Sequence, residues 1–558
     1  MINKIQIKDL NLIGLSILTF ISYIAGFFIT LIDIDATQYA AISKEMVLNG
    51  SLLEVFYRGN DYLDKPPMLF WTSAISFKIF GINHFAYRLP SFLISLLGIY
   101  SVYRFCIIFY NKQIAMSAIL ITANCQAFYL MHHDVRTDCM LTGFVMFSFW
   151  QMAAYMSTKK WKHLVFFSFA VAFAMMTKGP IGLMIIIIAF GSQFIITRSW
   201  HYIFNWHYLI AIGIIALLLF PMSWGLYHQF DLHPEKFVYG LQGPSGLRFF
   251  YWTQSFGRIT GESNWSNNPD TFFLVHSFLW SFLPWSLLFV PALVWALKIA
   301  FQNIRERIYT NEHISLCGFV FVFVFMSLSS YQLPHYTFVI HPLAAIILAR
   351  YMFHLRDAKQ NKMFLGIIIF TLLLLIAVAV YLSCYAFKQH FILCFCILLS
   401  TCIGLFFIIR AKNLIPFSKV LYAGAFGIAC INLILNVSVY PQILKYQAYS
   451  EIAFDINKID QNQSGSLIVF DKDYWCSLDF YLNRNILFST NQGCFDSISK
   501  SDNTWILTDT SHFNQIKDLY HFKNKKIYYH FPVSNLSIDF INPETRPKTL
   551  SPFVLAKF

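Results

Sequence analysis

The sequence predicts a polytopic α-helical membrane protein that carries a small α/β domain after its last membrane span. Hydrophobic residues make up 57% of the 558 residues and charged residues only 12%, and the mean hydropathy is +0.55. Water-soluble globular domains do not have this balance. Apolar runs long enough to cross about 30 Å of hydrocarbon as helices recur between residues 12 and 440, and strand-like and helix-like runs alternate after residue 440.

About thirteen apolar runs qualify as membrane spans. They cover residues 12–32, 89–110, 114–131, 139–156, 164–177, 180–197, 207–226, 272–297, 314–330, 336–353, 363–384, 390–409 and 420–440. The first run is too long for the apolar core of a cleaved signal peptide, and no small-residue cleavage pattern follows it. We therefore expect it to remain as the first span.

The basic residues of the short loops predict the orientation of the spans. Lys and Arg gather in one alternate set of loops, for example in 159–162, whereas the opposite short loops contain only Arg136, Lys178 and Lys388. Because basic loops are retained in the cytoplasm, we expect the N-terminus inside and, after an odd number of spans, the C-terminal tail outside. The net charge of +13 then reflects topology and contact with anionic membrane lipids, and no nucleic-acid partner is needed to explain it.

Most of the mass that does not span the membrane is predicted to lie outside. The membrane domain, residues 1–440, has two large outside loops at 33–88 and 227–271, and residues 441–558 form the second domain. In the first loop, apolar periodicity predicts helices at 37–48 and 68–80, both lying along the membrane surface. In the tail we expect strands at 466–470, 486–489, 504–507 and 526–531, and helices at 474–483 and 511–520.

The two cysteines of the outside tail are Cys476 and Cys494, while most other cysteines lie within spans. In an oxidising compartment these two thiols can form a disulfide. Their spacing alone does not decide whether they do.

Ionisable residues near the membrane gather on the outside face of this topology. They are Asp35, Asp64, Lys65, Arg88, Asp134, Arg136, Asp138, Lys178, Arg258, Glu262 and His335. An ionisable group at membrane depth is costly and therefore points to function. Random scatter would place several of these residues on the cytoplasmic face as well, so we expect them to converge on one cavity.

Several short motifs resemble those of a known family. The first loop reads Asp35-Ala36-Thr37-Gln38-Tyr39-Ala40 and then Asp64-Lys65-Pro66-Pro67, and later stretches read Thr177-Lys178-Gly179-Pro180, Phe282-Leu283-Pro284-Trp285 and Leu333-Pro334-His335-Tyr336. In this order, over most of residues 30–345, they resemble the polyprenyl-phosphate-dependent type C glycosyltransferases, which include protein O-mannosyltransferases and the lipid A aminoarabinose transferase. The chain departs from the aminoarabinose transferase pattern at Ala36 and Gln38, where that pattern has Glu and Arg.

The resemblance implies the multispanning type C fold, with a site fed laterally by a lipid-linked sugar. It assigns Asp35 as the catalytic acid of the first loop, and Lys65 and Arg258 as residues that bind the donor phosphate. Asp138 is a second catalytic candidate and Lys178 a further phosphate-binding candidate, because both begin or end spans at the outer surface. The substrate-binding candidates are Tyr39, Asp64, Tyr331, His335 and Tyr336.

These residue types suit displacement of a polyprenyl phosphate from an anomeric carbon. Departure of the phosphate leaves an anion, which preorganised cations stabilise in the transition state. A carboxylate on the other face of the sugar can orient or deprotonate the acceptor and stabilise positive character on the ring. No cofactor is required. A divalent metal at His132, His133 and Asp134 is an alternative, although adjacent histidines have poor ligand geometry.

Each candidate also has a purely structural explanation. Asp35 can cap the helix that begins near residue 37, Lys65 can extend toward lipid headgroups, and Arg258 can pair with Glu262 on the surface. The remaining explanations are that Arg136 pairs with Asp138 at a helix N-terminus, that His335 satisfies a buried hydrogen bond, and that Tyr331 belongs to the interfacial aromatic belt.

The predicted function is inverting transfer of a sugar, with an amino sugar among the candidates, from undecaprenyl phosphate to lipid A or another envelope acceptor. The predicted location is a bacterial inner membrane, with the active site facing the periplasm. Protein O-mannosylation is the nearest alternative. A transporter or lipid flippase is the alternative from another class; it predicts midplane ionisable residues and interrupted helices in matching halves, and neither pattern is clear in the sequence.

Overall fold

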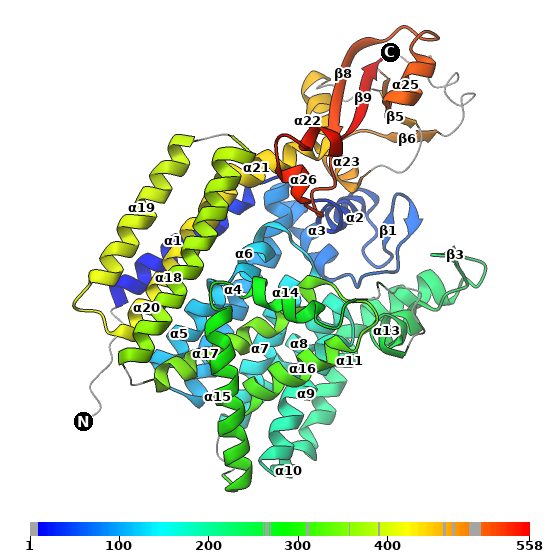
Figure 1. Cartoon of the computed structure of the whole chain (residues 1–558). Helices are drawn as coiled ribbons and strands as arrows, with labels where there is room; N and C mark the ends of the chain where they lie inside the picture. The colour runs from blue at the N-terminus through cyan, green and yellow to red at the C-terminus, as the bar shows by residue number, and fades with distance from the viewer. Residues whose placement is uncertain are drawn as a thin grey trace.

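A computed structural model describes residues 9–260, 262, 267, 269–308, 312–355, 358–388, 391–460, 465–470, 475–489 and 504–558. Most of the chain forms a bundle of helices, and the C-terminal domain stands at one end of this bundle, beside α2 (Asp35–Asn49) and α3 (Met68–Phe80) (Figure 1). The architecture is that of a multispanning helical membrane protein with a small C-terminal sheet, as the sequence predicts.

Among the described residues, 8 helices are long and apolar enough to cross a membrane, or up to 9 if one bent pair is a single span. The principal helices of the bundle are α1 (Asp9–Phe27), α4 (His84–Phe109), α5 (Lys112–Ala123), α6 (Gln126–His133), α7 (Thr137–Thr158), α8 (Trp161–Lys178), α9 (Ile181–Ile196), α11 (His207–Leu226), α14 (Phe273–Ser281), α15 (Ser286–Arg305), α16 (Ile314–Ser327), α17 (His341–His354), α18 (Ala358–Val380), α19 (Phe391–Arg410) and α20 (Pro416–Ile434). Each expected apolar run coincides with one helix or with a broken pair. Some of these helices are shorter than the length required of a span, so the count of thirteen spans stays a prediction.

Two of the expected spans are broken. The run 114–131 divides into α5 and α6, which meet at an angle of 53°, and the run 272–297 divides into α14 and α15. The two breaks contact each other: the backbone N–H of Gln126 donates to the carbonyl of Leu283 at 3.0 Å, and the Trp285 indole donates to the carbonyl of Asn124 at 2.8 Å. Irregular backbone at membrane depth is tolerated because the two breaks satisfy each other's polar groups.

The first-loop helices occur where they are expected, and α2 is largely buried within the protein. Nine of its 15 residues are buried, including Thr37 and Lys44. Helix α2 packs against α3 and against α23 (Cys476–Tyr481) of the C-terminal domain. The apolar face of the predicted helix therefore packs against protein.

Helices α4 and α7 pack backbone to backbone. A Cβ atom added to Gly98 would lie 2.8 Å from the Cα of Gly143, which is closer than real Cβ atoms approach. Small residues at such crossings are typical of membrane helices, because close packing replaces the hydrophobic driving force that lipid does not supply. This contact fixes the outer end of α7, where part of the candidate site lies.

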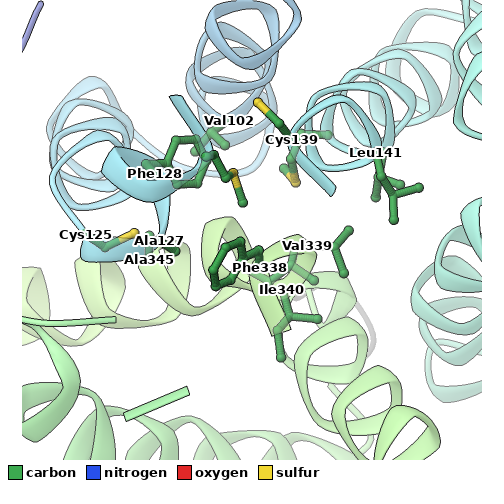
Figure 2. Close-up of a cluster of buried hydrophobic side chains, with 14 of the residues drawn as sticks. Val102, Cys125, Ala127, Phe128, Cys139, Leu141, Phe338, Val339, Ile340 and Ala345 are labelled. Atoms are coloured by element: carbon green, nitrogen blue, oxygen red, sulfur yellow. The ribbon is translucent and has the colours of Figure 1, made fainter. Parts of the chain in front are cut away.

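A buried cluster below the candidate site joins the N-terminal and C-terminal halves of the bundle. Figure 2 shows Phe128 of α6 and Cys139 and Leu141 of α7 facing Phe338 and Val339 of the 3₁₀ helix η3 (Pro334–Ile340). All five side chains are at most 6% exposed. The segment that follows the Leu-Pro-His-Tyr motif is therefore held firmly against the start of α7.

The C-terminal domain contains a five-stranded mixed sheet in the order β6-β5-β7-β9-β8. Its strands are β5 (Leu467–Phe470), β6 (Ile486–Ser489), β7 (Trp505–Asp509), β8 (Lys523–His530) and β9 (Ser551–Lys557), and its main helices are α22 (Ala448–Ile459), α23 and α25 (Thr510–Ile516). Strand β9 was not expected from the sequence. The helical run that contains α20 continues to Tyr446, past the expected boundary at residue 440. Cys494, one half of the disulfide that the sequence leaves open, lies outside the described residues.

Arg88 illustrates a buried charge with a structural role. Its side chain is fully buried on α4 and donates to the carbonyls of Phe27 at 3.0 Å, Ile29 at 2.5 Å and His133 at 2.9 Å. These carbonyls end α1, begin the first loop and end α6. Arg88 therefore stabilises three chain segments and is not one of the residues that line the cavity described below.

We expect Arg88→Ala to be one of the most destabilising single substitutions in the chain. It leaves buried carbonyls without a donor, and hydrogen bonds from a charged group each contribute about 1.5–3 kcal/mol, so the expected loss is about 3 kcal/mol or more. Thermal unfolding of the purified protein in detergent measures it. Arg104→Ala on the same helix is the control, since Arg104 bonds the Tyr100 hydroxyl at the exposed surface and lies over the Trp150 ring. An equal loss in both variants would contradict this role of Arg88.

Candidate functional site

A cavity of about 440 Å³ opens where the ends of several helices meet the first loop. The start of α2, the start of α7, the end of α8 and the start of η3 all reach it. Its lining residues are Asp35, Tyr39, Asp64, Lys65, Arg136, Thr137, Asp138, Leu141, Lys178, Ile181, Met184, Ile185, Gln254, Ser255, Phe325, Met326, Ser329, Tyr331, Leu333, His335, Tyr336 and Val339.

Arg136 connects the first loop to the start of α7. Its Nη1 donates to Asp35 Oδ2 at 2.5 Å, and its Nε donates to Asp134 Oδ2 at 3.0 Å. Burial acts to lower the pKa of Arg136, but the carboxylates of Asp134 and Asp35 outweigh it and hold the pKa above its ordinary value. Arg136 is therefore a permanent cation that fixes the Asp35 carboxylate at the cavity wall.

A second ion pair, formed by Lys178 and Asp138, lies near Arg136. Lys178 Nζ forms an ion pair with Asp138 Oδ1, and His335 Nε2 lies 3.6 Å from Asp138 Oδ2. The Nδ1 atom of His335 lies 3.4 Å from Arg136 Nη1, so His335 lies between the two ion pairs. Lys178 Nζ also lies 4.2 Å from the ring centroid of Tyr336, a cation–π contact.

Lys65 and Asp64 form the third charged pair. Lys65 Nζ donates to Asp64 Oδ2 at 2.7 Å, and the side chains are 18% and 22% exposed. Gln254 reaches the other oxygen of Asp64 at 3.5 Å. The Pro66-Pro67 pair directly after Lys65 disfavours a helix that starts earlier than Met68, so Lys65 is presented from the bend that precedes α3.

The remaining wall of the cavity is apolar. It consists of Leu141, Ile181, Met184, Ile185, Phe325, Met326 and Val339, which come from α7, α9, α16 and η3. Helices α9 and α16 pack against each other. The cavity thus combines ionic groups on one side with a hydrocarbon surface on the other, which suits an amphiphile whose head is charged.

The structure brings together nearly all of the residues singled out from the sequence. Asp35, Tyr39, Asp64, Lys65, Asp138, Lys178, Tyr331, His335 and Tyr336 all line the cavity. Arg258 is the second residue of α13 (Gly257–Thr260), but its side chain is not among those that the structure describes. Three more of the eleven ionisable residues do not line the cavity. Arg88 is the structural residue described above, Asp134 lies behind the cavity wall as a partner of Arg136, and Glu262 lies 3.6 Å from Arg248 Nη2.

Two of the structural alternatives are resolved by this geometry. Asp35 does not cap α2, because the helix begins at Asp35 itself and its N-terminal end has no side-chain cap. Arg136 pairs with Asp35 and Asp134, whereas the ion pair of Asp138 is with Lys178. The local assignment of Arg136 to Asp138 was wrong, because one partner of Arg136, Asp35, lies far away in the sequence and the other, Asp134, lies on the opposite side of Arg136 in the sequence.

Arg136, Gln254 and Ser255 line the cavity but were not named as site residues. Arg136 was among the outside ionisable residues, so its charge was a usable signal. Gln254 and Ser255 carry no such signal. Gln254 and Ser255 reach the cavity because the segment at 250–255 packs closely against Gly179, which has a φ of +81°. A Cβ atom added to Gly179 would lie 3.3 Å from Ser255 Oγ.

The described residues contain no group of three or more His, Cys, Asp or Glu side chains that could hold a metal ion. His132 Nε2 bonds the Ser95 hydroxyl at 2.7 Å, and the ring of His133 lies 4.4 Å from that of Tyr440. Asp134 is engaged by Arg136. The three residues that formed the metal hypothesis therefore have separate partners.

Comparison with known proteins gives a consistent family. Residues 64–224 match the model of the family described as dolichyl-phosphate-mannose-protein mannosyltransferase. An uncharacterized protein of Aquifex aeolicus (strain VF5) is 26% identical over 467 residues, 81% of this chain and 83% of that relative. An undecaprenyl phosphate-alpha-4-amino-4-deoxy-L-arabinose arabinosyl transferase of Proteus mirabilis (strain HI4320) is 27% identical over 57% of this chain and only 54% of its own length.

Among solved structures, the chain is similar to a crystal structure of ArnT from Cupriavidus metallidurans bound to undecaprenyl phosphate. The TM-score is 0.73 at 16% identity, and the match covers 98% of this chain and 97% of that one. At this identity the similarity establishes the fold. The family model, the named relatives and this structure are all similar to the chain in the way the polyprenyl-phosphate-dependent type C glycosyltransferases are expected to be.

Proposed function

We propose that the chain transfers a sugar from undecaprenyl phosphate to an envelope acceptor on the periplasmic face of a bacterial inner membrane, with lipid A as the leading acceptor. The observation that carries this proposal is the cavity itself, in which three acids and three cations face an apolar wall. The name of the Proteus mirabilis relative favours an amino-deoxy pentose as the sugar.

The donor fits the division of the cavity into polar and apolar walls. The apolar wall on α9 and α16 accommodates the prenyl chain, and the ionic side accommodates phosphate and sugar. Asp35, Asp64 and Asp138 balance Lys65, Arg136 and Lys178, so the empty cavity is nearly neutral. A donor phosphate adds negative charge and therefore draws Lys65 and Lys178 away from their carboxylate partners. Arg258 is proposed as a further phosphate ligand from its motif alone.

In the reaction, an acceptor oxygen attacks the anomeric carbon while the bond from that carbon to the phosphate oxygen breaks. The electron pair of the broken bond leaves with undecaprenyl phosphate, and the configuration at the anomeric carbon inverts. Lys65 and Lys178 stabilise the departing phosphate as its charge grows. Asp35, fixed by Arg136, orients the acceptor or takes its proton and stabilises positive character on the sugar ring.

The second candidate is protein O-glycosylation, which the description of the matching family model favours. It uses the same donor chemistry, so the cavity does not distinguish it from lipid modification. A hydroxyl of a Ser or Thr acceptor must lose a proton, whereas a lipid A phosphate is already anionic. Asp35 is then a base in the first case and a positioning carboxylate in the second.

Mass spectrometry of the envelope tests this proposal. Lipid A, surface glycans and membrane proteins are compared between cells that contain the chain and cells that lack it, with Asp35→Asn expressed at matched levels as a catalytic control. We expect a sugar adduct on lipid A only with the unaltered chain. An adduct on protein instead moves the function to O-glycosylation, and no difference in lipid A, glycans or proteins contradicts transfer altogether.

A further inference from the structure

The C-terminal domain holds the part of the first loop that precedes Asp35. Asp33 is 1% exposed, and its Oδ1 accepts from the backbone N–H of Ser477 at 3.0 Å while its Oδ2 accepts from the Ser477 hydroxyl at 2.7 Å. Asp33 Oδ1 also accepts from the Thr37 hydroxyl at 2.5 Å. One buried carboxylate therefore joins α23 of the C-terminal domain to the first turn of α2.

Two further residues of the C-terminal region hold the same segment. Gln447 is fully buried; its Oε1 accepts from the backbone N–H of Asp33 at 2.9 Å and its Nε2 donates to the carbonyl of Leu31 at 2.9 Å. The hydroxyl of Tyr481 accepts from the backbone N–H of Leu31 at 2.8 Å. The backbone just before Asp35 is thus fixed on both sides by residues more than 400 positions away.

The far part of α2 is held by the opposite end of α23. Lys44 Nζ donates to the carbonyls of Asp479 at 2.9 Å, Phe480 at 3.0 Å and Leu482 at 2.6 Å. A helix C-terminus leaves such carbonyls without an intrahelical partner, and a cation is favoured there. Helices α2 and α23 are therefore joined at both ends by charged side chains that are almost completely buried.

We propose that α23 of the C-terminal domain is a positioning element of the transfer site, with Ser477 and Asp33 as the positioning residues that set the place of Asp35. Asp33 faces Ser477, whereas Asp35 faces the cavity and Arg136. Neither Asp33 nor Ser477 lines the cavity. This inference rests on the proposed function, because it concerns how the carboxylate of the same site is held.

The expected size of the effect follows from the geometry that catalysis requires. Catalytic groups must be held within about 0.5 Å of their productive position, and a displacement of about 1 Å costs on the order of a hundredfold in rate. Burial raises the pKa of Asp33 to about 6, and the hydrogen bonds from Thr37 and Ser477 act against that rise. These bonds therefore favour the ionised form of the buried carboxylate.

Kinetics of the full-length enzyme in detergent test the proposal, with undecaprenyl phosphate-4-amino-4-deoxy-L-arabinose and lipid A as the substrates. For Ser477→Ala we expect kcat to fall by about 10–100-fold, with the KM for the donor within about twofold of the unaltered enzyme. Asp33→Ala should fall similarly, and the double variant should be no slower than the worse single one. Asp33→Asn keeps the shape and an acceptor oxygen, so it should retain most of the rate.

Ser511→Ala is the matched control, because Ser511 lies in the same domain and its hydroxyl donates to the neighbouring Asp509 at an exposed position. It should leave kcat unchanged. A purely structural role of Ser477 predicts a lower melting temperature with unchanged kcat per folded molecule, and that result would overturn the proposal. Independent losses that multiply in the double variant would overturn it as well.

Hydrogen exchange separates this inference from the proposed function, because it needs no substrate. In Ser477→Ala, backbone amides of residues 34–40 should exchange at least about tenfold faster, while those of α7 remain unchanged. Unchanged exchange at 34–40 overturns the positioning role whatever the activity. Conversely, exchange at 34–40 can be faster in Ser477→Ala while the unaltered enzyme transfers no sugar. That result leaves the positioning contact in place and removes only the proposed function.

Discussion

Asp35→Asn is expected to lower the transfer rate by at least about a hundredfold, which corresponds to about 2.7 kcal/mol of transition-state stabilisation. Asparagine keeps the shape of the side chain and a hydrogen-bond acceptor for Arg136, whose Nη1 lies 2.5 Å from Asp35 Oδ2. It removes the negative charge that the sugar and the acceptor require. The side chain lies at a cavity wall and is 34% exposed, so the fold should be unaffected.

Initial rates of sugar transfer by purified protein measure this effect, together with the melting temperature. Glu54→Gln is the matched control, because Glu54 belongs to the same loop, pairs with His228 at 2.8 Å and does not line the cavity. The control should keep its activity. If Asp35→Asn transfers sugar at the rate of Glu54→Gln, Asp35 is not part of the catalytic machinery.

Lys65→Met is expected to reduce kcat/KM for the donor by about 10²–10³-fold. Methionine has a similar length but no charge, so it cannot stabilise the phosphate that leaves. We choose Lys65 in preference to Lys178 because Asp64, the partner of Lys65, is 22% exposed and tolerates loss of the pair. Asp138, the partner of Lys178, is only 4% exposed and would be left as a buried carboxylate without its lysine.

The donor dependence of the rate at saturating acceptor measures the effect of Lys65→Met. Lys65→Arg restores the charge with a different geometry and should recover part of the rate. Lys78→Met is the control, since Lys78 is an exposed lysine near the end of α3, the helix that follows Lys65. Equal kcat/KM values for Lys65→Met and the unaltered enzyme would exclude Lys65 as a phosphate ligand.

Much of the fold was predictable because it depends on local patterns. The helix at 68–80 and the strand at 486–489 coincide with α3 and β6, and both have strong apolar periodicity between clear breaks. Strand β9 was missed because Pro552, its second residue, argues against a strand. In the structure Pro552 lies opposite Tyr529 of β8, at the start of β9, where a proline is tolerated. The breaks at Asn124 and Leu283 were missed because hydropathy detects an apolar run and not the distant backbone group that satisfies the break.

The candidate site was predictable as a set but not as a network. The side of the membrane assigned to each ionisable residue already grouped Asp35, Lys65, Asp138 and Lys178, and these residues share one cavity. The pairs Asp35–Arg136 and Asp138–Lys178 were not predictable, because their partners are distant in the sequence and an ion pair depends on distance in the folded chain. The roles of Arg88 as a carbonyl ligand and of Asp33 as a contact to the C-terminal domain were hidden for the same reason.

Photocrosslinking with a polyprenyl phosphate that carries a photoreactive prenyl chain tests most directly whether this cavity binds the donor. After irradiation of the full-length protein in detergent, crosslinked peptides are located by mass spectrometry. We expect labelling within α9 and α16, near Met184, Ile185, Phe325 and Met326, and we expect Lys65→Met to reduce it strongly. Labelling confined to other helices, or labelling of α9 and α16 that is equally strong in Lys65→Met, would contradict a donor site in this cavity.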